Sequence, residues 1–204
     1  MLNKIQYFFR QSWLLIVATF FYALLVVVVN SGLSSQIEAN RINKLNNLMK
    51  GLITQAEVFE KVIEELEVTD SHGRAVETAV FKALDSEGKL QGFAFIASGT
   101  GFADKIELVV ALDGRCEHFL GYAVLSSNET PGFGDRIKND YYRSQFSGAP
   151  VGILKLVKTG GAGSVDEEIV AISGATVSSR SVVEIINDFT KEVKRAITRE
   201  GLSI

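Results

Sequence analysis

The feature that most constrains this chain is a long uncharged segment close to its beginning. No residue from Gln11 to Ile37 carries a formal charge, and Trp13 to Val29 is almost entirely aliphatic or aromatic. The twelve Leu, Ile, Phe and Val side chains in that stretch favour transfer into a membrane by about 4–7 kcal/mol in total. With Ser12 and Asn30 to Gly32 included, the segment reaches the roughly 20 residues that a helix needs to cross the hydrocarbon core. We therefore expect a transmembrane helix at residues 12–33.

Two alternatives compete with this interpretation. A cleaved signal peptide has a shorter apolar region and a small-x-small cleavage site, to which Ser31-Gly32-Leu33 is a poor match. A core helix of a soluble protein is rarely apolar around its whole circumference. Lys4 and Arg10 precede the segment and no acidic residue does. The positive-inside tendency therefore predicts a cytoplasmic tail at residues 1–11 and an extracytoplasmic body.

The composition of this body excludes several functional classes. Only two of the 21 basic residues precede Glu38, so 19 remain against all 24 acidic residues. A mildly acidic body lacks the basic surface of a nucleic-acid-binding protein, so no nucleic-acid partner is expected. Cys116 is the only cysteine, and His72 and His118 are the only histidines. The chain cannot supply a cysteine-rich zinc site or hold an iron–sulfur cluster, so we expect no metal site, and redox chemistry would need an organic cofactor or a partner.

The spacing of apolar residues predicts the secondary structure of the body. Residues 34–70 are expected to form a helical connector, because apolar residues recur at three- and four-residue spacing between Ile42 and Ile53. Runs rich in β-forming residues follow, separated by short polar or Gly-containing breaks. These runs are 76–83, 90–97, 105–112, 118–125, 152–157 and 168–172.

The predicted fold class is α+β. Two breaks between the β-rich runs, Asp85-Ser86-Glu87-Gly88 and Asp113-Gly114, are short enough for hairpins, so the sheet is expected to be largely antiparallel. One transmembrane helix then precedes a single extracytoplasmic domain at residues 71–204, in which helices flank this sheet. A final helix at residues 178–199 would bury one apolar face. The residues of that face are Val182, Ile185, Ile186, Phe189, Val193 and Ile197.

A segment of small and hydroxyl-bearing residues joins the last β-rich run to the final helix. Gly174 allows a positive φ, and its small neighbours let a bulky group approach the backbone. Thr176 falls within about one turn of the helix N-terminus, where unpaired amides and the positive end of the helix dipole suit a phosphate. An ordinary helix start with Ser/Thr caps is the alternative. The residues expected to be near a bound group are Ser173, Gly174, Ala175, Thr176, Val177 and Ser178, with Ser179 and Arg180 as further donors.

A second informative segment runs from Ser127 to Asp135. Pro131 and Gly132 fit the centre of a type II turn, with Pro at the first corner and Gly at the positive-φ corner. Such a turn fixes the directions of Glu129 and Thr130, and Gly134 leaves space nearby. Taken alone, the segment predicts no more than a rigid turn.

Together these two segments resemble the FMN-binding domain family of membrane redox complexes. The motifs that carry the resemblance are Glu129 to Gly134 and Ser173 to Thr176, in this order behind one anchor. Within the family the chain is most similar to G subunits of the Rnf ion-translocating ferredoxin:NAD oxidoreductase, and C subunits of the sodium-translocating NADH:quinone oxidoreductase are the near alternative. Two positions depart from the family pattern: Asn128, where His is frequent, and Val170, where an acid is frequent.

The resemblance implies a function and a cofactor. It implies that a separate flavin transferase esterifies Thr176 to the phosphate of FMN, and that Glu129, Thr130, Pro131 and Gly132 belong to the flavin site. The chain would then be an electron-transfer subunit that relays electrons through covalent FMN to other subunits of a membrane ion-translocating oxidoreductase. Such complexes lie in the bacterial or archaeal cytoplasmic membrane, and the subunit would need no catalytic residue of its own.

Two functions of other classes are also open at this point. A serine hydrolase could use Ser173 as its nucleophile, but it would need His72 or His118 as a base, and the nucleophile-elbow pentapeptide is absent. A membrane-tethered sensor or assembly protein could use the same fold without flavin. Covalent flavin on Thr176 would separate the electron carrier from both.

Overall fold

The structure is a computed structural model of the 204-residue chain. It describes the backbone of residues 2–159 and 165–202 and the side chains of residues 11–159 and 165–202. The chain divides into two compact units, Met1–Asn43 and Lys44–Ile204. Lys4 and Arg10, on which the predicted orientation in the membrane depends, lie outside the described side chains.

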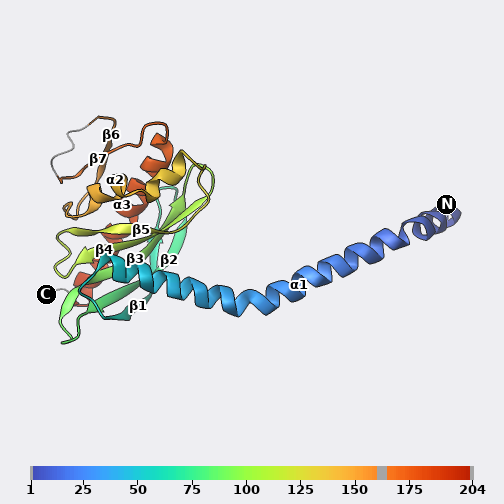
Figure 1. The fold of residues 1–204 in the computed structure, drawn as a ribbon, viewed down its shortest axis with the longest axis horizontal. Helices are drawn as coiled ribbons and strands as arrows, with labels where there is room; N and C mark the ends of the chain where they lie inside the picture. The colour runs from blue at the N-terminus through green and yellow to red at the C-terminus, as the bar shows by residue number, and fades with distance from the viewer. Residues whose placement is uncertain (1, 160–164, 203–204) are drawn as a thin grey trace. The chain divides into compact units, whose positions relative to one another are not determined.

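The first unit consists of the greater part of one long helix, α1, which runs from Leu2 to Leu52. Among the residues that the structure describes, one helical segment, Gln11–Leu52, is long and apolar enough to cross a membrane. The side chains of its most apolar part are not buried against any described part of the chain, so the chain itself does not shield this surface from water. The predicted span at residues 12–33 lies inside this helix (Figure 1) and has the length and the surface of a membrane anchor.

The second unit is built on a five-stranded sheet with the simplest antiparallel topology. Each strand pairs with the next one along the chain, in the order β1-β2-β3-β4-β5 (Figure 1). The expectation of a largely antiparallel sheet is therefore confirmed. The strands are β1 (Val58–Thr69), β2 (Ala75–Leu84), β3 (Leu90–Thr100), β4 (Lys105–Asp113) and β5 (Phe119–Ser127).

The prediction of a helical connector over residues 34–70 is wrong in its second half. The helix ends at Leu52, and residues 58–69 form β1, which pairs with β2. Two register shifts between Lys61 and Leu66 disturb this ladder. A β-bulge offsets the two-residue alternation of apolar side chains, so the sequence does not show the period of a strand. The domain therefore begins before residue 71, and the compact unit starts at Lys44.

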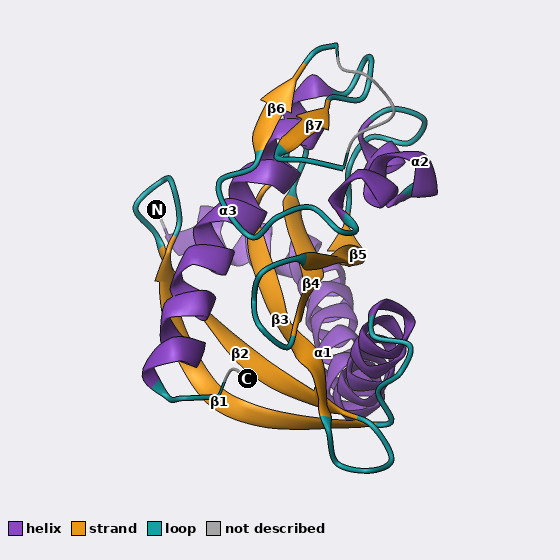
Figure 2. Cartoon of the chain, turned by 90° about the vertical axis from the view of Figure 1, so that its left-hand side faces the viewer, coloured by secondary structure: helices purple, strands orange, loops and turns teal. Residues whose placement is uncertain are grey.

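Both faces of the sheet are covered (Figure 2). The last helix, α3 (Thr176–Arg199), packs on one face, where its side chains share a core with Phe93 and Phe95. On the other face, Met49 near the end of α1 and Ile53 directly after it pack with small side chains of the central strands. All six residues predicted for the buried face of the last helix are buried: Val182, Ile185, Ile186, Phe189, Val193 and Ile197.

Short elements connect β5 to α3 and support the start of that helix. The β-rich run predicted at residues 152–157 forms a strand only in its last three residues, and it pairs with the next strand in parallel. The buried hydroxyl of Tyr122 donates to the carbonyl of Ile137 at 2.7 Å and so fixes this connection on the sheet. The connecting elements are η1 (Gly134–Lys138), α2 (Asp140–Arg143), η2 (Ser144–Phe146), β6 (Lys155–Val157) and β7 (Glu168–Val170).

Candidate functional site

The start of α3 exposes backbone donors that no side chain caps. The helix begins at Thr176, and Ala175 in the N-cap position offers no side-chain acceptor. The amide of Ser179 makes the first bond of the helical type, to the carbonyl of Ala175 at 3.0 Å. The three amides before it, on residues 176–178, have no acceptor within the helix. They gather at the positive end of the helix dipole, an arrangement that binds anions.

The loop before α3 is held rigidly from behind. Gly174 has a φ of 81°, so the predicted positive φ is confirmed. The hydroxyl of Ser179 accepts from the amide of Ile172 at 3.0 Å and donates to the carbonyl of Ala175 at 2.9 Å. The hydroxyl of Tyr142 donates to the carbonyl of Ser179 at 3.0 Å, and burial raises the pKa of Tyr142 so that this donor keeps its proton. The expectation that Ser179 donates to a ligand is therefore wrong, because its hydroxyl closes the loop.

A buried carboxylate lies behind the first turn of α3. Glu129 is only 4% exposed. It accepts from the amide of Ala103 at 2.9 Å and from the hydroxyl of Ser178 in a short hydrogen bond. A Cβ atom on Gly101 would stand 2.3 Å from one carboxylate oxygen, and a Cβ on Gly134 would stand 2.6 Å from the other. Glycine at both positions therefore makes room for the carboxylate.

The predicted type II turn is confirmed, and it lies beside the helix start. The amide of Phe133 donates to the carbonyl of Thr130 at 3.2 Å, and Gly132 has a φ of 77°. The turn leaves the ring of Phe133 57% exposed. A Cβ on Gly174 would lie 3.6 Å from that ring, so the two motifs face each other across a short distance.

The two motifs enclose a cavity of about 430 Å³. Six of the predicted site residues line it, and three others, Pro131, Gly132 and Ser173, do not. Glu129 is not among the lining residues and lies behind two of them, Ser178 and Gly134. The complete lining is Phe102, Thr130, Phe133, Gly134, Gly174, Ala175, Thr176, Val177 and Ser178.

Sequence reasoning missed the aromatic part of this lining. Phe102 is 66% exposed, and together with Phe133 it gives the cavity two apolar rings open to solvent. Each Phe sits between or beside glycines, in Gly101-Phe102 and in Gly132-Phe133-Gly134. A large apolar residue in a glycine-rich turn is rarely buried in the core. This placement in the sequence could have indicated that Phe102 and Phe133 are exposed at a binding site.

The cavity fits a flavin mononucleotide in three respects. Its volume lies in the range of about 300–1,000 Å³ that is usual for ligand pockets. Uncapped amides at one end suit the phosphate, and exposed aromatic and aliphatic side chains suit the planar flavin ring. Thr176 lines the cavity and is partly exposed, so its hydroxyl-bearing side chain is accessible at the same helix start as these amides.

The residues that a hydrolase or a metal site would use lie elsewhere. No histidine is among the residues that line the cavity. His118 belongs to a group with Asp113 and Glu117 at the β4–β5 turn, and one ligand atom from each could meet within 4.8 Å. One carboxylate oxygen of Asp113 already accepts from the amides of Glu117 and His118, at 2.7 and 3.3 Å. This group therefore closes a hairpin.

Comparisons with known proteins agree with this geometry. Residues 101–191 match the FMN-binding domain family, and this range contains both motifs. The chain is 29% identical to the G subunit of the ion-translocating oxidoreductase complex of Methanosarcina acetivorans, over 81% of this chain and 83% of the relative. It is 27% identical to the G subunit of the proton-translocating ferredoxin:NAD(+) oxidoreductase complex of Clostridium ljungdahlii, over 72% of this chain and 71% of the relative.

A solved structure has the same fold. NqrC of Shewanella oneidensis superimposes with a TM-score of 0.51 at 26% sequence identity, over 70% of this chain and 73% of that one. The family match covers the cavity, and the two G-subunit relatives extend the likeness over most of the chain. The part of the chain that matches the FMN-binding domain family, residues 101–191, includes every residue that lines the cavity.

Proposed function

We propose that this chain is an electron-transfer subunit of a membrane ion-translocating oxidoreductase of the Rnf type, and that it carries FMN as a phosphoester on Thr176. The observation that carries the proposal is the position of Thr176 at the uncapped start of α3, on the wall of a cavity flanked by Phe102 and Phe133. Bound FMN supplies reversible uptake and release of electrons, which the side chains of the chain cannot supply.

The attachment uses the side chain of Thr176 as its only covalent contact. The oxygen of the Thr176 hydroxyl would form a bond to the phosphorus of a flavin phosphate that a transferase presents as a phosphoanhydride. The anhydride bond to the second phosphate would break, and that phosphate would leave with the hydroxyl proton. The uncapped amides hold the phosphate oxygens during and after this step. Ser173, Gly174 and Val177 are exposed around Thr176, so a transferase has access to the segment from outside.

The other residues of the site orient and shield the cofactor. The Glu129–Ser178 hydrogen bond fixes the first turn of α3 and with it the direction of the amides. Phe102, Phe133 and Val177 offer apolar surface to the ring and exclude water from it. The proposed electron transfer needs no side chain of the site as a proton donor or acceptor.

The membrane anchor explains the need for a covalent bond. We infer that α1 crosses the membrane once, with its beginning in the cytoplasm, so that the domain lies in the extracytoplasmic space beside the other subunits of the complex. A flavin that dissociated there would be diluted beyond recovery. A phosphoester removes that loss, whatever the affinity of the cavity.

The attachment can be tested on the full-length chain from its native membrane. The intact mass of wild type should exceed the sequence mass by one FMN less one water, and a denaturing gel should show a fluorescent band. Thr176→Val removes the hydroxyl with little change of shape and should abolish the band, while Thr176→Ser should retain some of it. Thr198→Val removes a threonine hydroxyl of the same helix, bonded to the carbonyl of Lys194 and outside the lining of this cavity, and is the matched control. An unmodified wild-type Thr176 in native material would refute the proposal and favour a sensor of the same fold.

A further inference from the structure

The hairpin tip between β3 and β4, residues 100–105, forms one wall of the flavin cavity. The amide of Gly101 donates to the carbonyl of Asp104 at 2.8 Å and closes the tip. Phe102 stands at its end and also lines an adjoining cavity of about 510 Å³, whose other lining residues include Arg74 and Thr100. The position of the tip therefore sets where Phe102 stands relative to the flavin site.

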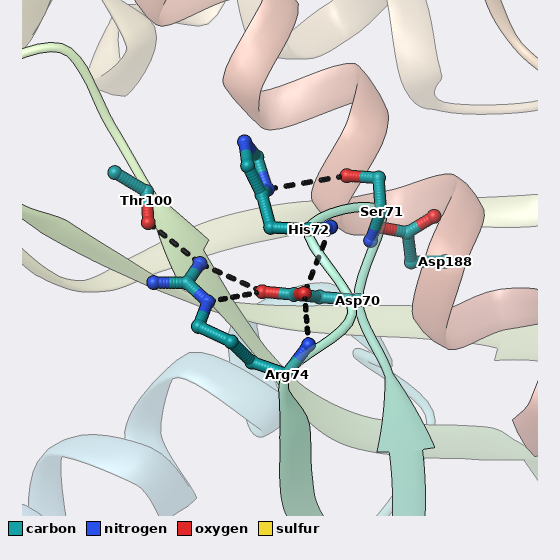
Figure 3. A network of polar contacts seen from close by, with 6 residues as sticks. All are labelled: Asp70, Ser71, His72, Arg74, Thr100 and Asp188. Atoms are coloured by element: carbon teal, nitrogen blue, oxygen red, sulfur yellow. Dashed lines mark hydrogen bonds and ion pairs between the residues drawn. The ribbon is translucent and has the colours of Figure 1, made fainter.

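Arg74 is hydrogen-bonded to the base of this tip (Figure 3). Its Nη2 donates to the hydroxyl of Thr100 at 2.7 Å, across to the last residue of β3. The same guanidinium is held by Asp70, which accepts from Nε at 2.8 Å and from Nη2 at 2.7 Å. Two hydrogen bonds to one carboxylate fix the orientation of a guanidinium. The hydrogen bond from Arg74 to Thr100 therefore comes from a side chain that is already held in place.

Asp70 itself is fixed by the β1–β2 turn. It is 7% exposed, and its other oxygen accepts from the amides of His72 and Arg74 at 2.9 and 2.8 Å. Burial alone would raise the pKa of Asp70, but the hydrogen bonds from Arg74 and His72 and the charge of Arg74 lower it, so the carboxylate stays ionised. The turn is also tied to α3, because the amide of Ser71 donates to the carboxylate of Asp188 at 2.8 Å (Figure 3).

The far side of the tip is tied to the motif that contains the Pro-Gly turn. The amide of Ala103 donates to Glu129, which is bonded to Ser178 on α3. The side chain of Asn128 donates to the carboxylate of Asp104 at 2.8 Å. The tip is thus held on one side by Arg74 and on the other by Asn128 and Glu129.

We propose that Arg74 is a positioning residue of the flavin site, which acts through Thr100 to hold the β3–β4 tip and its Phe102 against the bound flavin. This inference rests on the proposed function and extends it to a residue outside the cavity that contains Thr176. Arg74 acts through contact with Thr100, because its Nε and Nη2 are both engaged within the chain. The alternative is a direct electrostatic effect of the guanidinium charge on the flavin.

Three substitutions separate these two modes of action. Thr100→Val keeps the shape of residue 100 and the charge of Arg74 but removes the acceptor. Arg74→Lys keeps the charge, but a single ammonium cannot reproduce two bonds to Asp70 together with one to Thr100. Arg74→Gln removes both the charge and the fork. Arg195→Gln is the matched control, because Arg195 is an exposed arginine on α3 with one ion pair, to Glu192.

The first readout is amide hydrogen exchange of residues 100–105. Loss of one hydrogen bond should raise the exchange rate of the tip about fivefold in all three variants and leave the Arg195→Gln protein unchanged. The Arg74→Gln, Thr100→Val double variant should exchange no faster than either single variant, because both remove the same contact. These measurements repeated in the Thr176→Val background do not depend on the flavin.

The second readout is iodide quenching of the flavin fluorescence in holoprotein. It should increase by a similar factor in all three variants, because a loosened tip uncovers the flavin. One result would replace positioning by a direct charge effect. In it, the exchange rate of the tip is unchanged in Thr100→Val and Arg74→Lys, and the flavin midpoint potential is altered only in Arg74→Gln. Additive effects in the double variant would also overturn positioning. Absence of flavin from wild type refutes the proposed function, whereas flavin-loaded variants identical to wild type refute only the role of Arg74.

Discussion

Two kinds of polar loop in this molecule differ in whether their backbone amides have a hydrogen-bond acceptor within the loop. At each of three hairpin turns an aspartate side chain accepts two backbone amides of its own turn. At the start of α3, by contrast, three amides have no acceptor within the helix, and the N-cap residue is an alanine. The amides that the turns satisfy belong to His72 and Arg74 at Asp70, Glu87 and Lys89 at Asp85, and Glu117 and His118 at Asp113.

The contrast shows where the fold leaves binding capacity unused. A loop whose amides are satisfied internally gains stability and offers little to a ligand, since a new acceptor would have to displace the carboxylate. A loop that lacks a cap loses that stability and retains its donors. The start of α3 is the second kind, and a bound anion would complete its hydrogen bonding.

The largest effect is expected from removing the most buried of the turn carboxylates. Asp70→Ala removes a buried carboxylate that accepts from the amides of His72 and Arg74 and from the Arg74 guanidinium, so we expect the free energy of unfolding to fall by about 2–3 kcal/mol. Asp85 makes the same turn contacts closer to solvent, and Asp85→Ala should cost about 1 kcal/mol. Urea unfolding of both variants measures the difference. Equal losses would show that burial does not distinguish the turns.

A smaller loss is expected when space behind the start of α3 is filled. A Cβ on Gly134 would stand 2.6 Å from both Glu129 and the Ser178 hydroxyl, so Gly134→Ala should force this pair apart. We expect a loss of about 1–2 kcal/mol and less flavin attached to Thr176, seen as weaker in-gel fluorescence.

The matched control for this substitution is Gly51→Ala. Gly51 lies in α1, and a Cβ there would meet no atom within 4 Å. Alanine favours a helix over glycine by about 0.5–1 kcal/mol, so this variant should be as stable as wild type or more so. Full flavin attachment in Gly134→Ala would show that the Glu129–Ser178 pair does not set the direction of the amides.

The same contrast explains what the sequence could and could not predict. The turn at Pro131-Gly132 and the positive φ of Gly174 follow from local preferences of Pro and Gly, and both are confirmed. The final helix was expected from residue 178, and it begins two residues earlier, at Thr176. Strand β1 was missed because its bulges hide the two-residue period and its glutamates favour a helix. Rules based on local sequence cannot predict a strand that forms because it pairs with a neighbouring strand.

The contacts that shape the cavity are of this second, nonlocal kind. The bond between Arg74 and Thr100 joins residues 26 positions apart, and that between Glu129 and Ser178 joins residues 49 positions apart. No spacing rule connects such pairs. Ser178 and Ser179 were expected as ligand donors by type, but both hydroxyls serve the fold.

Acid should reduce the free energy of unfolding that the ionised Asp70 carboxylate contributes. The reduction should begin at a pH at which this carboxylate is still ionised in the folded state. Hydrogen bonds hold the pKa of Asp70 below its usual 3.8. A carboxylate with a lowered folded-state pKa contributes stability that is fully present above its unfolded-state pKa and is lost as the pH falls through the folded-state value. The difference in stability between wild type and Asp70→Asn should therefore be constant near neutral pH and shrink from about pH 4 downward. A difference that grew in acid would contradict the role of the ionised carboxylate.

The smallest expected effect tests the contrast away from both regions, at two buried threonines. Thr190 is 3% exposed and its hydroxyl is buried without a hydrogen-bond partner in the described structure, whereas the hydroxyl of buried Thr78 donates to the carbonyl of Ile96 at 2.5 Å. Because an unsatisfied hydroxyl costs free energy while a satisfied one contributes it, Thr190→Val should stabilise the protein by about 0.5–1 kcal/mol, and Thr78→Val should destabilise it by about 1 kcal/mol. Thermal unfolding of the two variants should shift in opposite directions. A shift in the same direction would mean that hydrogen-bond satisfaction does not govern the stability of polar groups in this fold, and the interpretation of the uncapped amides at Thr176 would lose its physical basis.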